Sequence, residues 1–144
     1  MVEQDTIRLL HECDAGIKMG ISSINDVLNY TRDKGLYSLL ERCKEEHNEL
    51  GEQICSLLRE YHDEGKNPNP IAKGMSKIKT NLKISVSESD KTVASLMTDG
   101  CNMGVKSLSK YLNQYAAADE ISKDICKKLI KIEDQLSVDL RDYL

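Results

Sequence analysis

The chain has 144 residues and a net charge of −4, and it lacks tryptophan and phenylalanine. This length fits one domain over 1–144, and an apolar content drawn mainly from Leu, Ile, Val, Met and Ala is typical of an all-α bundle. The interspersed charges argue against nucleic-acid binding, which needs a clustered basic surface, and no apolar run is long enough to cross a membrane.

The residues at the start of the sequence lack the basic first part and the apolar stretch of a signal peptide, which predicts a cytoplasmic protein. The five cysteines, at positions 13, 43, 55, 101 and 126, form no C-x-x-C pair. In a reducing compartment such cysteines usually serve as small buried hydrophobic residues. The alternative is a metal ligand or a redox thiol.

The first predicted helix spans about 4–32, where apolar residues recur every three or four positions. Its apolar stripe includes one carboxylate, Asp14. Because a buried carboxylate needs a partner, we expect Asp14 to form an ion pair with a lysine, such as Lys18 one turn away. A second stripe of small residues includes Gly16 and Gly20.

A turn is predicted at 33–35, with Gly35 in the left-handed conformation that ends a helix. The second helix is predicted over about 36–62, and its apolar stripe contains His47. The short turn makes the first two helices an antiparallel pair. The segment 63–70, which holds both prolines of the chain, is the clearest break in the sequence.

The third predicted helix spans about 88–116, with Ser87 and Asp90 in the pattern of a capping box. The fourth spans about 119–143. No helix-breaking residue separates these two helices, but one continuous helix of that length would be exceptional. We therefore place a turn at 116–119, with Asp119 as the N-cap of the fourth helix.

The segment 71–82 is amphipathic and predicts a short crossover helix between the second and third long helices. Two helical hairpins joined by one long crossover have the connectivity of a ferritin-like bundle. The predicted fold is therefore an all-α, four-helix, up-down-down-up bundle.

Two further glycines, Gly100 and Gly104, interrupt the third helix, although each interior glycine costs about 1 kcal/mol relative to alanine. Counting outward from the turns places them at the height of Gly20 and Gly16. We predict that these small residues let the first and third helices approach most closely near Gly20 and Gly100. The alternative is that the glycines leave space for a ligand.

The sequence lacks the Glu-x-x-His motifs that ferritin-like di-iron centres require. His47 is predicted to lie level with Asp99 and Glu133. An alternative to a di-iron centre is therefore a single iron or zinc ion held by few ligands. Its candidate ligands are His47, Asp99, Glu133, Cys101 and Cys43. The competing interpretation is a core histidine hydrogen-bonded to Asp99 or to a serine, with no cofactor. His11 and His62 are predicted to be surface residues without partners.

These residues resemble a bacterial ferritin-like family of unknown function that has a D-G-x-x-G-like first helix and a G-E-like third helix. The matching elements are Asp14-Ala15-Gly16 with Gly20, Gly65-Lys66-Asn67-Pro68, Gly74-Met75 with Leu82-Lys83, and Asp99-Gly100-Cys101. Cys101 stands where the family pattern has glutamate, and the break between the last two helices lacks the family's proline. The resemblance implies the fold, and it implies no settled activity.

The sequence therefore favours a non-catalytic structural or interaction module that forms a homodimer or binds another protein. One alternative is a metal-binding oxidoreductase or storage protein with a reduced site. Another is a carrier of an apolar ligand, held in the space beside the glycines.

Overall fold

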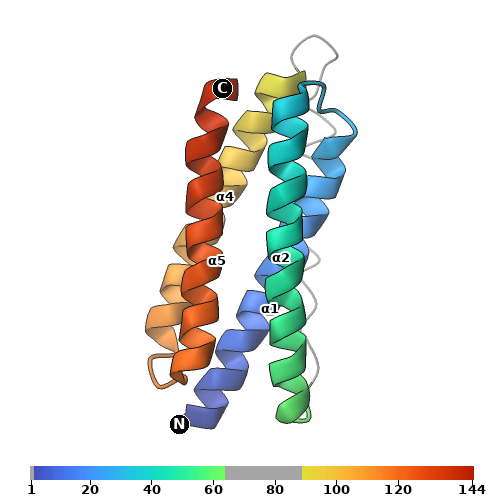
Figure 1. The fold of residues 1–144 in the computed structure, drawn as a ribbon. Helices are drawn as coiled ribbons and strands as arrows, with labels where there is room; N and C mark the ends of the chain where they lie inside the picture. Colours follow the sequence, from blue (N-terminus) through green and yellow to red (C-terminus); the bar gives the residue numbers. More distant parts are fainter. Residues whose placement is uncertain (1, 64–88) are drawn as a thin grey trace.

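The computed structural model describes residues 2–63 and 89–144, and these residues contain only helices and turns (Figure 1). The helices are α1 (Val2–Leu28), α2 (Lys34–Glu60), α4 (Ser89–Gln114), α5 (Glu120–Asp139) and the 3₁₀ helix η1 (Leu140–Tyr143). The predicted helix at 71–82 lies outside the described residues. The fourth predicted helix was expected to reach 143. It ends as an α-helix at 139 and continues as the 3₁₀ helix η1 to 143.

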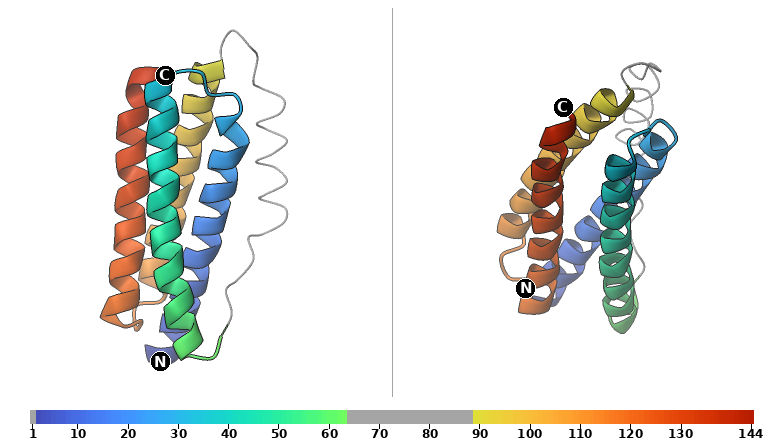
Figure 2. Two further views of the ribbon diagram at one scale, coloured as in Figure 1. Left: turned by 45° about the vertical axis from the view of Figure 1, so that its right-hand side comes forward. Right: turned by 45° about the horizontal axis from the view of Figure 1, so that its top comes forward.

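The four long helices form two antiparallel hairpins, α1 with α2 and α4 with α5 (Figures 1 and 2). Both α2 and α4 run from the upper end of Figure 1 to the lower end. Helix α1 packs against α2, α4 and α5, and α5 also packs against α2. Each hairpin thus buries its apolar stripes against the other hairpin.

Helix α1 ends at Leu28, four residues before the predicted end. The Thr31 hydroxyl donates a hydrogen bond to the carbonyl of Val27 at 2.9 Å and so satisfies one carbonyl that the ending helix leaves without a partner. Asp33 then caps α2, because its side chain accepts a hydrogen bond from the backbone N–H of Leu36 at 3.0 Å.

The α1–α2 turn is also held by α4. The Asp90 carboxylate accepts hydrogen bonds from the backbone N–H groups of Arg32, at 2.7 Å, and Asp33, at 3.1 Å. Asp90 of α4 thus stabilises the turn of the neighbouring α1–α2 hairpin. The prediction for Gly35 is wrong, since no described glycine has a positive φ. Gly35 lies in the first turn of α2, where a Cβ atom would come within 2.7 Å of the Tyr143 hydroxyl.

The predicted turn between the last two helices is confirmed, and Asp119 caps α5 by accepting a hydrogen bond from the Ser122 N–H at 2.8 Å. The start of α1 holds this turn from outside. Asp5 accepts a hydrogen bond from the Ala117 N–H at 3.1 Å, and the Thr6 hydroxyl accepts one from the Asp119 N–H at 2.8 Å. These contacts compensate for the absence of a helix-breaking residue at 116–119.

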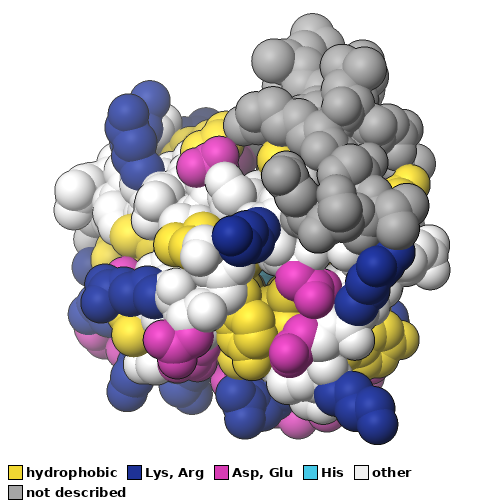
Figure 3. All heavy atoms as spheres, turned by 90° about the horizontal axis from the view of Figure 1, so that it is seen from above, with side chains coloured by type: hydrophobic (Ala, Val, Ile, Leu, Met, Phe, Trp, Pro, Cys, Tyr) yellow, Lys and Arg dark blue, Asp and Glu magenta, His cyan; other side chains and the backbone are white. Residues whose placement is uncertain are grey.

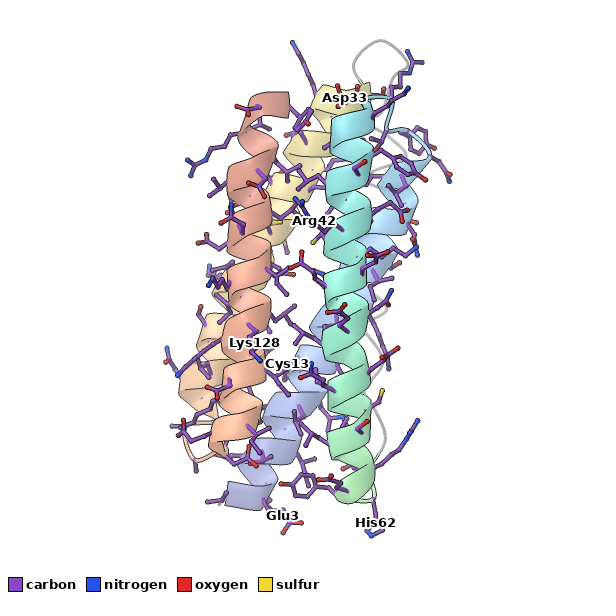
Figure 4. All side chains as sticks on the ribbon, viewed as in Figure 1. Glu3, Cys13, Asp33, Arg42, His62 and Lys128 are labelled. Atoms are coloured by element: carbon purple, nitrogen blue, oxygen red, sulfur yellow. The ribbon has the colours of Figure 1, made fainter. Side chains whose placement is uncertain are left out.

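Helix α2 ends at Glu60, two residues before the predicted end, at the lower end of the bundle. His62 has φ of 56°, a left-handed conformation that is uncommon for residues other than glycine and that stops the helix. Figure 4 shows His62 and Glu3 at this end and Asp33 at the opposite end.

The core consists of two apolar clusters stacked along the bundle. The lower cluster lies toward the N-terminus in Figure 1 and contains Leu9, Leu10, Cys13, Ile17, Leu50, Ile54, Leu58, Leu108, Ala118, Ile125, Cys126 and Leu129. The upper cluster contains Ile24, Val27, Leu28, Leu36, Leu40, Cys43, Val93, Ala94, Met97, Cys101, Leu136 and Leu140. Residues 44–49 of α2 and 130–135 of α5 therefore fall between the two clusters.

Candidate functional site

A buried histidine and a buried glutamate meet between the two apolar clusters. His47 of α2 is 2% exposed, and Glu133 of α5 is 8% exposed. Both residues continue the apolar stripes of their helices, since His47 follows Cys43 by four positions and Glu133 follows Leu129 by four. Helix geometry therefore turns both polar side chains into the core. The structure brings these two predicted site residues together, with Nε2 of His47 3.6 Å from Oε1 of Glu133.

The other two long helices supply glycines at this level. A Cβ atom at Gly20 of α1 would lie 3.0 Å from Nε2 of His47, and a Cβ atom at Gly104 of α4 would overlap the Glu133 carboxylate. Each glycine thus makes room for a polar side chain from another helix. All four long helices contribute to the site, two with side chains and two with the absence of a side chain.

The predicted close approach of helix backbones at Gly20 and Gly100 is wrong. Gly100 is exposed, and a Cβ atom there would meet nothing within 4 Å. Gly20 faces the imidazole of His47, which is on α2. Only Gly16 faces α4, where a Cβ atom would make an ordinary contact of 3.8 Å with Leu108.

The orientation of the His47 ring is fixed from its own helix. Nδ1 lies 2.8 Å from the carbonyl oxygen of Cys43, and because a carbonyl can only accept, Nδ1 carries a proton and donates it. The sulfur of Cys43 lies 3.6 Å from the same nitrogen. On the opposite edge of the ring, Nε2 has no hydrogen-bond partner, and neither does Oε2 of Glu133, although both atoms are buried.

The surroundings of His47 change its protonation. Burial by itself lowers the pKa of His47, but interactions with Cys43 and Glu133 outweigh this effect and raise the pKa to about 10. At neutral pH the ring is therefore an imidazolium that faces a carboxylate. This ion pair joins α2 of one hairpin to α5 of the other.

Cys101 of α4 is, with Cys43, one of the two buried thiols of the upper cluster, and it is 4% exposed. Burial raises the pKa of Cys101 to about 12, with further contributions from the charges of Glu133 and Cys43. Its thiol is therefore protonated at neutral pH.

Asp99 lies outside the core. It is exposed on α4, where it lines an open depression with Lys91, Thr92, Ser95 and Leu96. Helix α4 buries Met97 and Cys101, and a residue midway between two positions one turn apart points to the opposite side of the helix. Glu133, rather than Asp99, is the carboxylate that faces His47. Among residues 2–63 and 89–144, no three His, Cys, Asp or Glu side chains are grouped closely enough to hold a metal ion.

The expected ion pair of Asp14 is present. Lys18 Nζ lies 2.9 Å from Oδ2 of Asp14, which is 2% exposed as a residue. The prediction that His11 has no partner is wrong, because its Nε2 lies 3.0 Å from Oδ1 of Asp63. This pair joins positions 52 residues apart, and no local pattern in the sequence reveals it. It borders an open depression between Arg8 and Tyr115.

The cysteines are all free, and four of the five are buried, as expected of small hydrophobic residues. Cys13 points into the bundle (Figure 4) and shares a hydrogen bond with Cys126, which raises the pKa of Cys13 and lowers that of Cys126. Cys55 is the exposed one.

The view from the upper end shows basic, acidic and apolar side chains interspersed on the visible surface (Figure 3).

No helix among the described residues combines the length and the hydropathy that a membrane span requires.

Comparison with known proteins supports the fold of the chain but indicates no function. No protein-family model matches the chain, and no curated protein matches it. It is similar to the crystal structure of a DUF305 fragment from Deinococcus radiodurans, with a TM-score of 0.77 and 11% sequence identity, over 96% of this chain and 93% of that one. The chain thus shares an all-α fold with a domain of unknown function.

Proposed function

We propose that this chain is a non-catalytic module with a ferritin-like fold, which acts by protein interaction and pairs with a second copy of itself. One observation carries the non-catalytic part of the proposal. The charged side chains buried in the described core face opposite charges within the chain, as Asp14 faces Lys18 and His47 faces Glu133. The two depressions described above are open at the surface and lie away from both pairs.

The directions of the helices support the ferritin-like assignment. Helices α2 and α4 run the same way, so a connection as long as the bundle must join them, which is the arrangement of two hairpins linked by one crossover. The absence of Glu-x-x-His motifs from the sequence separates this bundle from ferritin-like di-iron proteins.

The lower end of the bundle supports self-association. Val2 is 60% exposed and Ile121 is 61% exposed, and both are large apolar residues. The hydrogen bonds from the 117–119 turn to Asp5 and Thr6 place the start of α1 beside the start of α5. An apolar end of this kind is suited to contact with the same end of a second copy, because a two-fold dimer uses one surface twice.

Sedimentation velocity over a range of protein concentrations tests the proposal. The wild-type chain is expected to sediment with twice the 16.2 kDa mass of one chain. Ile121→Lys should shift it to the monomer, because the lysine ammonium would be desolvated at the interface. Met103→Lys is the matched control, since Met103 is 69% exposed on α4 away from this end.

A wild-type chain that remains monomeric at all concentrations would overturn the proposed self-association. A dimer that Ile121→Lys leaves intact would overturn the proposed interface. The apolar-carrier alternative has no support at the glycines, because the space beside Gly20 and Gly104 is filled by His47 and Glu133.

A further inference from the structure

Two buried atoms of the central pair lack hydrogen-bond partners, although the pair itself is enclosed. Nε2 of His47 and Oε2 of Glu133 have almost no accessible surface and no hydrogen bond. An unpartnered buried polar atom is costly, and in native structures it calls for an explanation such as a bound ion or water. The two side chains face each other through Nε2 and Oε1, while Oε2 lies toward Gly104 of α4. One occupant bound both to Nε2 and to the carboxylate group would give both side chains a partner.

The geometry of the pair fits two ligands of one metal ion. Donor atoms that each lie about 2.0–2.2 Å from a tetrahedral ion are about 3.3–3.6 Å apart. The Nε2 to Oε1 distance is 3.6 Å, too long for a hydrogen bond but close to this spacing. The hydrogen bond from Nδ1 to the Cys43 carbonyl is the second contact by which metal-binding histidines are usually oriented, and it leaves Nε2 directed at Glu133.

The structure also discriminates between the thiols that could complete such a site. The sulfur of Cys43 lies beside Nδ1, on the edge of the ring that faces away from Glu133. Cys101 is buried on α4, three residues before Gly104, so it lies on the same face of the helix as the glycine that makes room for the Glu133 carboxylate. A thiol, an imidazole and a carboxylate together suit Zn²⁺ better than the oxygen-preferring cations.

We propose that His47, Glu133 and Cys101 bind one zinc-like divalent ion at the centre of the bundle. Since these three side chains are not grouped closely enough in the described structure to hold an ion, binding requires that side chains of the site move as the ion enters. Binding forms bonds from the ion to Nε2, to the carboxylate and to the sulfur. The proton on Nε2 and the thiol proton of Cys101 are released to solvent, so the charge of the three ligands changes from net zero to −2 and balances the ion.

Titration of chelator-treated, reduced protein with Co²⁺, followed by displacement with Zn²⁺, tests this site. The wild-type chain is expected to bind one equivalent and to show a sulfur-to-cobalt charge-transfer absorption, which arises only when a thiolate binds the ion. Cys101→Ala should abolish this absorption, and Cys43→Ala should retain it. His47→Gln should weaken Co²⁺ binding at least tenfold.

Three controls make the result specific. Cys55→Ala removes the exposed thiol and should change nothing. His11→Ala removes the other histidine that faces a carboxylate and should leave Co²⁺ binding intact. Circular dichroism identifies any variant that fails to fold, and Cys101→Ala, which leaves the ion pair in place, keeps the test decisive if His47→Gln does not fold. Wild-type protein that binds no Co²⁺, or that keeps the charge-transfer band in Cys101→Ala, overturns the proposal. The site does not depend on self-association, so the two proposals fail independently.

Discussion

Two glycines of α4, four residues apart, are predicted to respond to alanine in opposite directions. Gly100 is exposed and a Cβ atom there meets nothing within 4 Å, whereas a Cβ atom at Gly104 would overlap the Glu133 carboxylate. In an exposed helix interior, alanine is more favourable than glycine by about 1 kcal/mol. We therefore expect Gly100→Ala to raise the free energy of unfolding by up to about 1 kcal/mol.

The same propensity gain applies at Gly104, but a larger cost opposes it. The added Cβ must displace the Glu133 carboxylate, which separates it from His47. Breaking a buried ion pair costs about 3–5 kcal/mol, because the remaining charge is left without a partner. Subtracting the propensity gain of about 1 kcal/mol, we expect Gly104→Ala to lower the free energy of unfolding by about 2–4 kcal/mol.

Urea denaturation followed by circular dichroism measures both effects, provided that the dependence on denaturant stays the same in all variants. Adding Glu133→Ala to each variant identifies the cause. Without the carboxylate, Gly104→Ala should lose most of its cost, while the effect of Gly100→Ala should be unchanged. If Gly104→Ala stabilised the protein as much as Gly100→Ala, the inferred role of the glycine would be wrong.

Three further predictions concern the buried groups. In the native protein a thiol reagent should modify Cys55 rapidly and the four buried cysteines only on unfolding, which mass spectrometry of the labelled peptides can follow; rapid modification of Cys13 would contradict the described packing. Lys18→Gln should lower the free energy of unfolding by about 1–3 kcal/mol, because it removes the partner of a buried carboxylate. Asp14→Leu should cost less, because the ammonium of Lys18 is half-exposed and water can reach it. Urea denaturation measures both variants, and the reverse order would contradict this prediction. Asp119→Ala should lower the thermal midpoint, since loss of an N-cap costs about 1 kcal/mol, and an unchanged midpoint in calorimetry would show that Asp5 and Thr6 hold the turn alone.

Much of this arrangement could be predicted from the sequence because it depends on local periodicity. The apolar stripes placed Asp14 and His47 in the core, and both are 2% exposed. Counting along the helices from the turns also brought Glu133 to the height of His47. Such counting fixes height but not rotation about the helix axis, which is why Asp99 was expected inside and lies outside.

The role of the glycines could not be predicted for a different reason. A glycine in a helix shows that a Cβ atom is absent, but it does not show whether a backbone or a side chain of another helix fills the space. Gly20 and Gly104 make room for side chains, and Gly100 makes room for nothing. The contact of His11 with Asp63 depends on where α2 ends, which is set by the left-handed residue His62 rather than by a helix-breaking sequence.

The central site combines two features that reduce the stability of a helical bundle. Each of its interior glycines costs about 1 kcal/mol in helix propensity, and burying a charged pair often gives no net gain over apolar residues of similar volume. Packing alone requires neither feature, because apolar side chains at 47 and 133 with alanines at 20 and 104 could connect the two apolar clusters into one. Binding of an ion would explain why this position keeps two polar side chains and two glycines, because apolar side chains cannot bind an ion. Nε2 of His47 lies 3.6 Å from Oε1 of Glu133, and neither Nε2 nor the second carboxylate oxygen, Oε2, has a hydrogen bond. Such a pair can bind an ion, and the two glycines provide the space that both side chains occupy.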